Sequence, residues 1–91
     1  MTYRFSYHRR IPQDLEKLSP VDLKRVQAAI EMKLKNHPEL FGKPLGQSLV
    51  QCWSLRVGDY RVIYRIIGAV VSIEIIGHRS TVYPSAAKRL R

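Results

Sequence analysis

Apolar and polar residues recur at regular intervals along most of the chain, and these intervals predict its secondary structure. Tyr3, Phe5 and Tyr7 alternate with polar residues, which is the period of a β-strand. Residues 11–18 and 20–35 carry apolar residues at helical spacing. We expect these two segments to form a helical hairpin that turns just before the second of them.

The second helical segment carries signals for both of its ends. Ser19 suits the capping position, Pro20 fits the first helical position, and Asp22 is the acidic residue three positions after the cap. Pro38 ends the helix. The apolar positions form one stripe along the helix: Leu23, Val26, Ile30 and Leu34.

No regular period is visible in residues 38–49. Gly42, Pro44 and Gly46 interrupt this segment, so we predict a loop. Its larger apolar side chains are expected to pack into the core: Leu40, Phe41 and Leu45.

The second half of the chain predicts an antiparallel three-stranded meander. The expected strands cover residues 51–57, 60–67 and 70–79. Gly58–Asp59 suits a two-residue type II′ connection between the first two, and a second turn is expected at Gly68–Ala69.

The order of elements predicts a single α+β domain over residues 1–91. An N-terminal strand, a helical hairpin and then the meander are typical of helices packed on one face of a mainly antiparallel sheet. We expect the N-terminal strand to join this sheet at a position left open, and the tail 84–91 to form at most a helical turn. No membrane span or signal peptide is visible, so we expect a cytoplasmic protein without membrane contact.

The predicted hairpin register places Arg56 directly opposite Arg61, on a face shared with Arg65. Facing like charges repel, and Glu74 alone cannot balance these arginines. We interpret this face as a phosphate-binding site, because arginine suits bidentate phosphate contact. The alternative is a solvated face on which Glu74 neutralises Arg65. In this register the third strand adds Ser72, Glu74 and Ile76 to the basic face, while the core face receives Val71, Ile73 and Ile75.

Charge and composition narrow the possible partners. The net charge is +9, from 16 Lys+Arg against 7 Asp+Glu, which implies a polyanionic partner, either nucleic acid or an acidic protein. A basic surface without a specific partner is the alternative. With one cysteine, Cys52, and three scattered histidines, the sequence predicts neither a metal site nor a cofactor.

Three stretches of the sequence, "GKPL", "WSLRVGDYRVIYRI" and "IIGHRSTVY", are similar to the RelE/ParE superfamily of toxin-antitoxin toxins. The resemblance covers nearly the whole chain. It implies a toxin that is neutralised by a cognate antitoxin and that reaches operator DNA only through that antitoxin. RelE-like members cut mRNA in the ribosomal A site without a metal, and we expect that activity here. A ParE-like poison of DNA gyrase, or a degenerate toxin kept as a binding module, are the alternatives.

The resemblance also implies site residues. Arg61, Arg79 and Tyr83 match the arginines and the late tyrosine of RelE-type active sites. The two lysine positions of that pattern fall on Cys52 and Ser54, neither of which is basic, so the general base stays open.

His78 is a further catalytic candidate, because imidazole ordinarily titrates near neutrality. Straight alternation places His78 on the basic face and Arg79 on the other, and a bulge at Gly77 would reconcile this with the family pattern. Further contacts to RNA phosphates are expected from four basic residues: Arg56, Arg65, Lys88 and Arg89.

Overall fold

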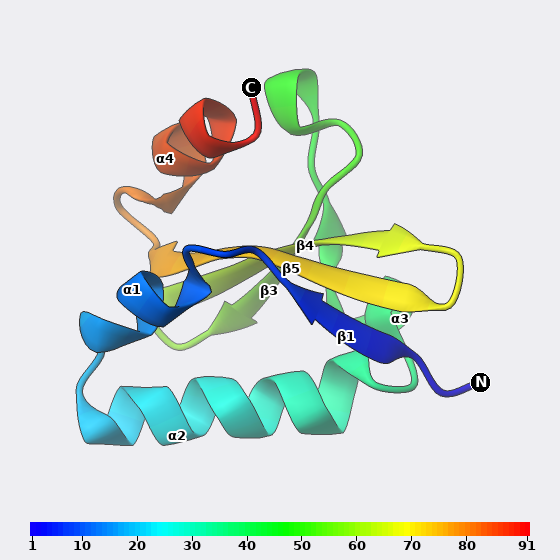
Figure 1. Cartoon of the computed structure of the whole chain (residues 1–91), viewed down its shortest axis with the longest axis horizontal. Coiled ribbons are helices and arrows are strands. Elements are labelled where there is room, and N and C mark those ends of the chain that lie inside the picture. The colour runs from blue at the N-terminus through cyan, green and yellow to red at the C-terminus, as the bar shows by residue number, and fades with distance from the viewer.

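A five-stranded sheet forms the middle layer of the protein, with helices above and below it (Figure 1). The computed structural model describes all residues from Met1 to Arg91. In chain order the elements are β1 (Arg4–Tyr7), α1 (Ile11–Glu16), α2 (Pro20–Ala29), a π-helical continuation (Ile30–Leu34), α3 (Pro38–Phe41), β2 (Lys43–Pro44), a 3-10 turn (Gln47–Leu49), β3 (Trp53–Val57), β4 (Tyr60–Ile67), β5 (Val70–His78) and α4 (Val82–Arg89).

The strands are ordered β1-β5-β4-β3-β2, and β1 pairs with β5 in parallel. All other neighbouring strands are antiparallel. This confirms the predicted α+β class and gives the N-terminal strand its place at one edge. No helix is both long enough and apolar enough to cross a bilayer.

The capping signals of the long helix act as predicted. The Ser19 hydroxyl accepts a hydrogen bond from the Asp22 backbone N–H at 3.2 Å, and Pro20 is the first residue of α2. Val26, Ile30 and Leu34 are buried against the sheet. The apolar stripe is therefore buried against the sheet, as its helical period predicts. The last five helical residues, Ile30–Leu34, form a π-helix.

The segment after this helix is more ordered than predicted. It contains α3, the two-residue strand β2 and the 3-10 turn. Pro38 is buried and Gly42 packs against Tyr64, so these two positions, four residues apart, face the sheet. Leu40 and Phe41 consequently point outward and are 70% and 46% exposed, so the prediction that they enter the core is wrong.

Gly42 lies too close to Tyr64 to carry a side chain. A Cβ at this position would stand 1.8 Å from the Tyr64 hydroxyl, which donates to the Pro38 carbonyl. We expect Gly42→Ala to lower the free energy of unfolding by about 2–4 kcal/mol, because it overpacks the site and breaks a buried hydrogen bond. Urea denaturation measures this. Gly46→Ala is the matched control, since nothing lies within 4 Å of its Cβ. Equal unfolding midpoints for the two variants would contradict this packing.

The predicted pairing is confirmed next to both turns. Arg56 pairs with Arg61 across the first turn, and Ile67 pairs with Val70 across the second. Gly58 has φ +59, a left-handed conformation that glycine adopts without strain.

β5 contains a bulge that the predicted register lacks. Tyr64 pairs with Ile73 and Ile63 pairs with Ile75, so Glu74 is the extra residue. Its Oε2 accepts from Arg65 Nε and from the Ser72 hydroxyl, both at 2.8 Å, which keeps Glu74 on their face.

The bulge reverses the faces of the residues that follow it. Ile76 packs in the core beside α1 and α2, and Ile75 packs on the opposite face. Both assignments are the reverse of those predicted. His78 stands opposite Tyr60 and therefore lies on the core face rather than on the basic face. The bulge that causes this change lies at Glu74, and not at Gly77 as predicted.

Each face of the sheet has its own apolar core. The larger cluster joins α1 and α2 to the sheet, as predicted for the helical hairpin. On the other face α4 contributes Val82 and Ala86 to a second cluster that includes Cys52, Ile63 and Ile75. The tail is therefore a helix of eight residues rather than a single turn, and helices cover both faces (Figure 1).

Candidate functional site

A pocket of about 280 Å³ lies where β2, β3 and β4 meet the first turn of α4. It is lined by three basic side chains and no carboxylate: Lys43, Arg56 and Arg61, with Pro44, Leu45, Ser54 and Tyr83. We refer to it as the cationic pocket. It occupies the part of the second face that the apolar cluster under α4 leaves open.

Arg56 and Arg61 stand directly opposite each other in this pocket. Arg61 Nη1 donates to the carbonyl oxygens of Gly58 and Tyr60, both at 2.9 Å, so the turn fixes its orientation. Neither arginine forms an ion pair within the protein. Because facing like charges destabilise a sheet, a bound anion would stabilise this pair of arginines.

Tyr83 brings a hydroxyl group into the cationic pocket from α4. Its Oη lies 3.2 Å from the Ser54 Oγ, and either group can be the donor. Ser54 is buried beneath it. The structure thus brings together Arg56, Arg61 and Tyr83, three of the residues that the sequence predicts.

Arg79 and His78 lie outside the cationic pocket. The Arg79 guanidinium stands 3.6 Å from the Asp59 carboxylate at the β3–β4 turn, and its backbone N–H donates to the Asp59 carbonyl at 2.8 Å. His78 packs edge-on against Tyr60, with ring centroids 5.6 Å apart, and its Nδ1 lies 2.7 Å from the Ser80 hydroxyl. The sheet therefore separates His78 from Arg61, whereas Arg79 remains beside the turn.

Arg65 and Lys88 also lie away from the cationic pocket. Arg65 pairs with the buried Glu74. For this residue the alternative interpretation holds, in which Glu74 neutralises the arginine. Lys88 is exposed on α4 and forms no ion pair, so its ammonium remains accessible to a polyanion.

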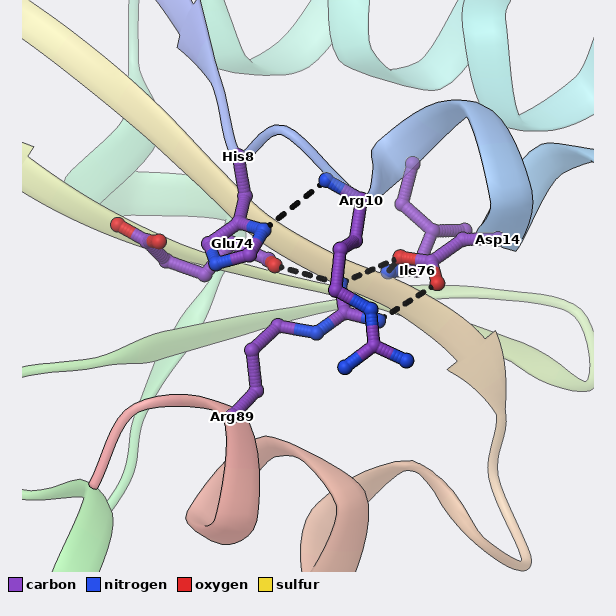
Figure 2. A network of polar contacts seen from close by, with 6 residues as sticks. All are labelled: His8, Arg10, Asp14, Glu74, Ile76 and Arg89. Carbon is purple, nitrogen blue, oxygen red and sulfur yellow. Dashed lines mark hydrogen bonds and ion pairs between the residues drawn. The ribbon is translucent and has the colours of Figure 1, made fainter.

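Arg89 is buried in a polar network rather than exposed on a tail (Figure 2). Its Nη1 and Nη2 donate to the two carboxylate oxygens of Asp14, both at 2.8 Å, and Nη1 also donates to the Glu74 carbonyl at 3.0 Å. Both side chains are less than 10% exposed. The prediction that Arg89 contacts RNA phosphates is therefore wrong, because its donors are used inside the protein.

The open edge of β5 explains this network. β1 leaves the sheet after the His8 N–H has bonded to the Ile73 carbonyl, so no strand covers this edge of β5 beyond Ile73, while β4 pairs with its other edge. Asp14 accepts from the Ile76 N–H at 3.1 Å and Arg89 donates to the Glu74 carbonyl, which satisfies two edge groups. Asp14 is not among the residues predicted from the sequence, although its spacing from Ile11 places it on the inner face of α1.

Cys52 is one of the two residues at the lysine positions of the RelE-type pattern, and it is buried. Burial raises the pKa of the thiol, and the Glu74 carboxylate raises it further, so little thiolate forms near neutral pH. We expect Cys52 in the native protein to react with a disulfide reagent at least tenfold more slowly than in the unfolded chain, followed by absorbance at pH 7.5. Equal rates in the native and the guanidinium-unfolded protein would contradict this.

The fold is shared with RelE-like toxins, and comparison with known proteins defines the family of this chain. The family described as "ParE toxin of type II toxin-antitoxin system, parDE" matches residues 5–83. The chain therefore belongs to this family, within the RelE/ParE superfamily, and is a toxin of a toxin-antitoxin module.

Individual relatives agree with this membership. Toxin RelG of Mycobacterium tuberculosis (strain ATCC 25618 / H37Rv) is 33% identical over 85 residues, which cover 91% of this chain and 98% of RelG. The toxin-antitoxin complex RelBE2 of M. tuberculosis contains a chain that matches with a TM-score of 0.80 and 33% identity over 87% of this chain and 100% of that one. A mutant of E. coli toxin RelE in the free state has a TM-score of 0.75 over the full length of both chains, and at 23% identity this shows a shared fold.

Proposed function

We propose that this toxin is a ribosome-dependent endoribonuclease that cuts mRNA and is neutralised by a cognate antitoxin. The cationic pocket is the observation that carries the proposal. It holds Arg56 and Arg61 with a tyrosine hydroxyl and no carboxylate, which suits the phosphodiester backbone of RNA.

The chemistry of RNA cleavage fits these groups. The 2′-oxygen attacks the adjacent phosphorus and loses its proton to solvent water, and the bond from phosphorus to the 5′-oxygen breaks as that oxygen gains a proton. Arg56 and Arg61 would stabilise the negative charge that develops on the phosphate oxygens, which is usually the largest catalytic contribution. Tyr83 would donate its proton to the 5′-oxygen, with Ser54 holding the phenol in place.

Arg79 has a supporting role in this proposal. Its pair with Asp59 is long and both side chains are largely exposed, so the interaction is weak and an RNA phosphate can displace it. His78 faces the other side of the sheet and receives no role in the reaction.

An antitoxin would cover the same charged surface when the toxin is inactive. The chain carries a net charge of +9, and an acidic antitoxin segment would compete with RNA for it. A related M. tuberculosis protein has been solved as a toxin-antitoxin complex, which supports this assignment. We propose that the toxin contacts operator DNA only through the antitoxin, and that it acts in the cytoplasm, where ribosomes are.

A gyrase poison is the second candidate function. The matching family is the ParE toxins, and this chain has Cys52 and Ser54 where the RelE-type pattern has lysines. Both observations favour a toxin without nuclease activity.

Induced expression without the antitoxin separates the candidates. Cellular mRNA 5′ ends and gyrase-linked DNA breaks are mapped in the same culture. The proposal expects growth arrest with new mRNA ends in translated regions and intact DNA. DNA breaks with intact mRNA would establish the gyrase poison instead, and normal growth would indicate a degenerate binding module.

A further inference from the structure

Lys43 in β2 is placed directly opposite Ser54 in β3. Residues that face each other in an antiparallel pair direct their side chains to the same face, with Cβ atoms about 5 Å apart. Lys43 therefore lies on the face that carries Ser54, Arg56 and Arg61, and it lines the cationic pocket with them.

Lys43 extends the row of positive charge across three strands. Arg56 lies two residues beyond Ser54 on β3, which makes it the diagonal neighbour of Lys43, and Arg61 faces Arg56 from β4. Lys43 is exposed and forms no hydrogen bond or ion pair through its side chain. Three basic side chains thus line a pocket that contains no acidic residue.

Ser54 on β3 and Cys52 just before it bring no charge to the cationic pocket, so the cation on the neighbouring strand matters. Ser54 is buried and its hydroxyl pairs with Tyr83, so a long side chain there would displace the tyrosine. Cys52 is buried under α4 beside Ala86 and Val82. Neither Ser54 nor Cys52 presents a charged group to a ligand, whereas the flexible stem of Lys43 lines the same pocket from one strand away.

We propose that Lys43 is a substrate-contacting residue of the cationic pocket, where its ammonium binds an RNA phosphate and supplies the positive charge that Cys52 and Ser54 do not. This inference rests on the proposed function, because it takes RNA as the ligand. The role assigned to Lys43 is charge rather than proton transfer. Arginine keeps the charge but does not give up a proton in proteins, so it can replace lysine only in the first of these roles.

Two measurements on the same variants test the role of Lys43. The first is binding of a fluorescein-labelled RNA oligonucleotide with a 2′-O-methyl group at every position, which cannot be cleaved, by anisotropy over a range of salt. The second is the rate of mRNA cleavage on purified ribosomes. The variants are Lys43→Gln and Lys43→Arg, with Lys24→Gln, an exposed lysine of α2, as the matched control. Circular dichroism and thermal unfolding verify that each variant is folded.

Lys43→Gln is expected to weaken RNA binding about tenfold and to reduce the slope of log K against log salt by about 0.7, the value for one phosphate contact on a single strand. Its cleavage rate at low RNA concentration should fall by the same factor or more. Lys43→Arg and Lys24→Gln should remain within about twofold of the wild type in both assays.

The two readouts distinguish failure of this inference from failure of the proposed function. Cleavage by the wild type with unchanged binding and cleavage by Lys43→Gln would overturn the inference and leave the nuclease intact. A loss in Lys43→Arg as large as in Lys43→Gln would overturn the charge role. RNA binding that depends on Lys43, in a wild type that does not cut mRNA, would support the inference while the nuclease proposal fails. A wild type without either property would overturn both.

Discussion

Replacing Arg89 by methionine should lower the free energy of unfolding by about 3–5 kcal/mol, because the substitution leaves the Asp14 carboxylate buried without its partner. The variant also removes the donor to the Glu74 carbonyl, which lies on the open edge of β5. Urea denaturation followed by circular dichroism measures the change.

Two controls make the Arg89 experiment specific. Lys88→Met changes a neighbouring exposed residue of the same helix and should shift stability by less than about 0.5 kcal/mol. The double variant Asp14→Leu with Arg89→Met should lose less than the sum of the two single variants, since no unpaired charge remains. Additive losses, or an Arg89→Met protein as stable as the wild type, would show that the network contributes little.

Arg61→Ala should lower the rate of mRNA cleavage by about 10²–10³-fold, the usual effect of removing one preorganised group that stabilises developing charge. Arg61 is the member of the facing pair whose guanidinium the turn carbonyls hold in place, so no other side chain can take over its position. The effect should also appear as a loss of growth arrest when the variant is expressed without an antitoxin.

The matched control for Arg61 is Arg25→Ala. Arg25 is an exposed arginine on α2 that does not line the cationic pocket, although its guanidinium lies near Gly58 of the β3–β4 turn, and its 4.0 Å pair with Asp22 contributes little. We expect its cleavage rate to stay within about threefold of the wild type, since a single surface charge outside the site has a small effect. Equal losses in the two variants would remove the cationic pocket from consideration as the active site.

Local sequence signals were sufficient to predict much of the fold. A two-residue turn with glycine in the left-handed region allows only one register, so the Arg56–Arg61 pair follows from the chain itself. Ser19 and Pro20 likewise mark the start of α2 through interactions within one helical turn.

Features that depend on distant partners were not predictable in the same way. The bulge at Glu74 is held by Arg65 on another strand, and the helical tail is tied to Asp14, 75 residues before Arg89. Among the basic residues of α4, Val82 and Ala86 form a small apolar face. This face is recognisable only once it is seen to pack against the sheet.

The candidate site shows the same division between local and distant interactions. Arg56 and Arg61 share one hairpin, and Tyr83 was placed beside them only through the family resemblance. Lys43 was missed because the two-residue strand β2 exists only through its pairing with β3, which residues 38–49 do not signal.

The most direct test of the proposed nuclease uses purified translating ribosomes that are stalled with a defined codon in the A site. Wild-type toxin and Arg61→Ala are added at equal concentrations, and mRNA 5′ ends are mapped by primer extension. We predict a new end within the A-site codon for the wild type, and at least a hundredfold less of it for the variant. Intact mRNA with the wild type, under conditions in which a known ribosome-dependent endoribonuclease used as the positive control cuts, would contradict the proposal that this toxin is an mRNA endonuclease.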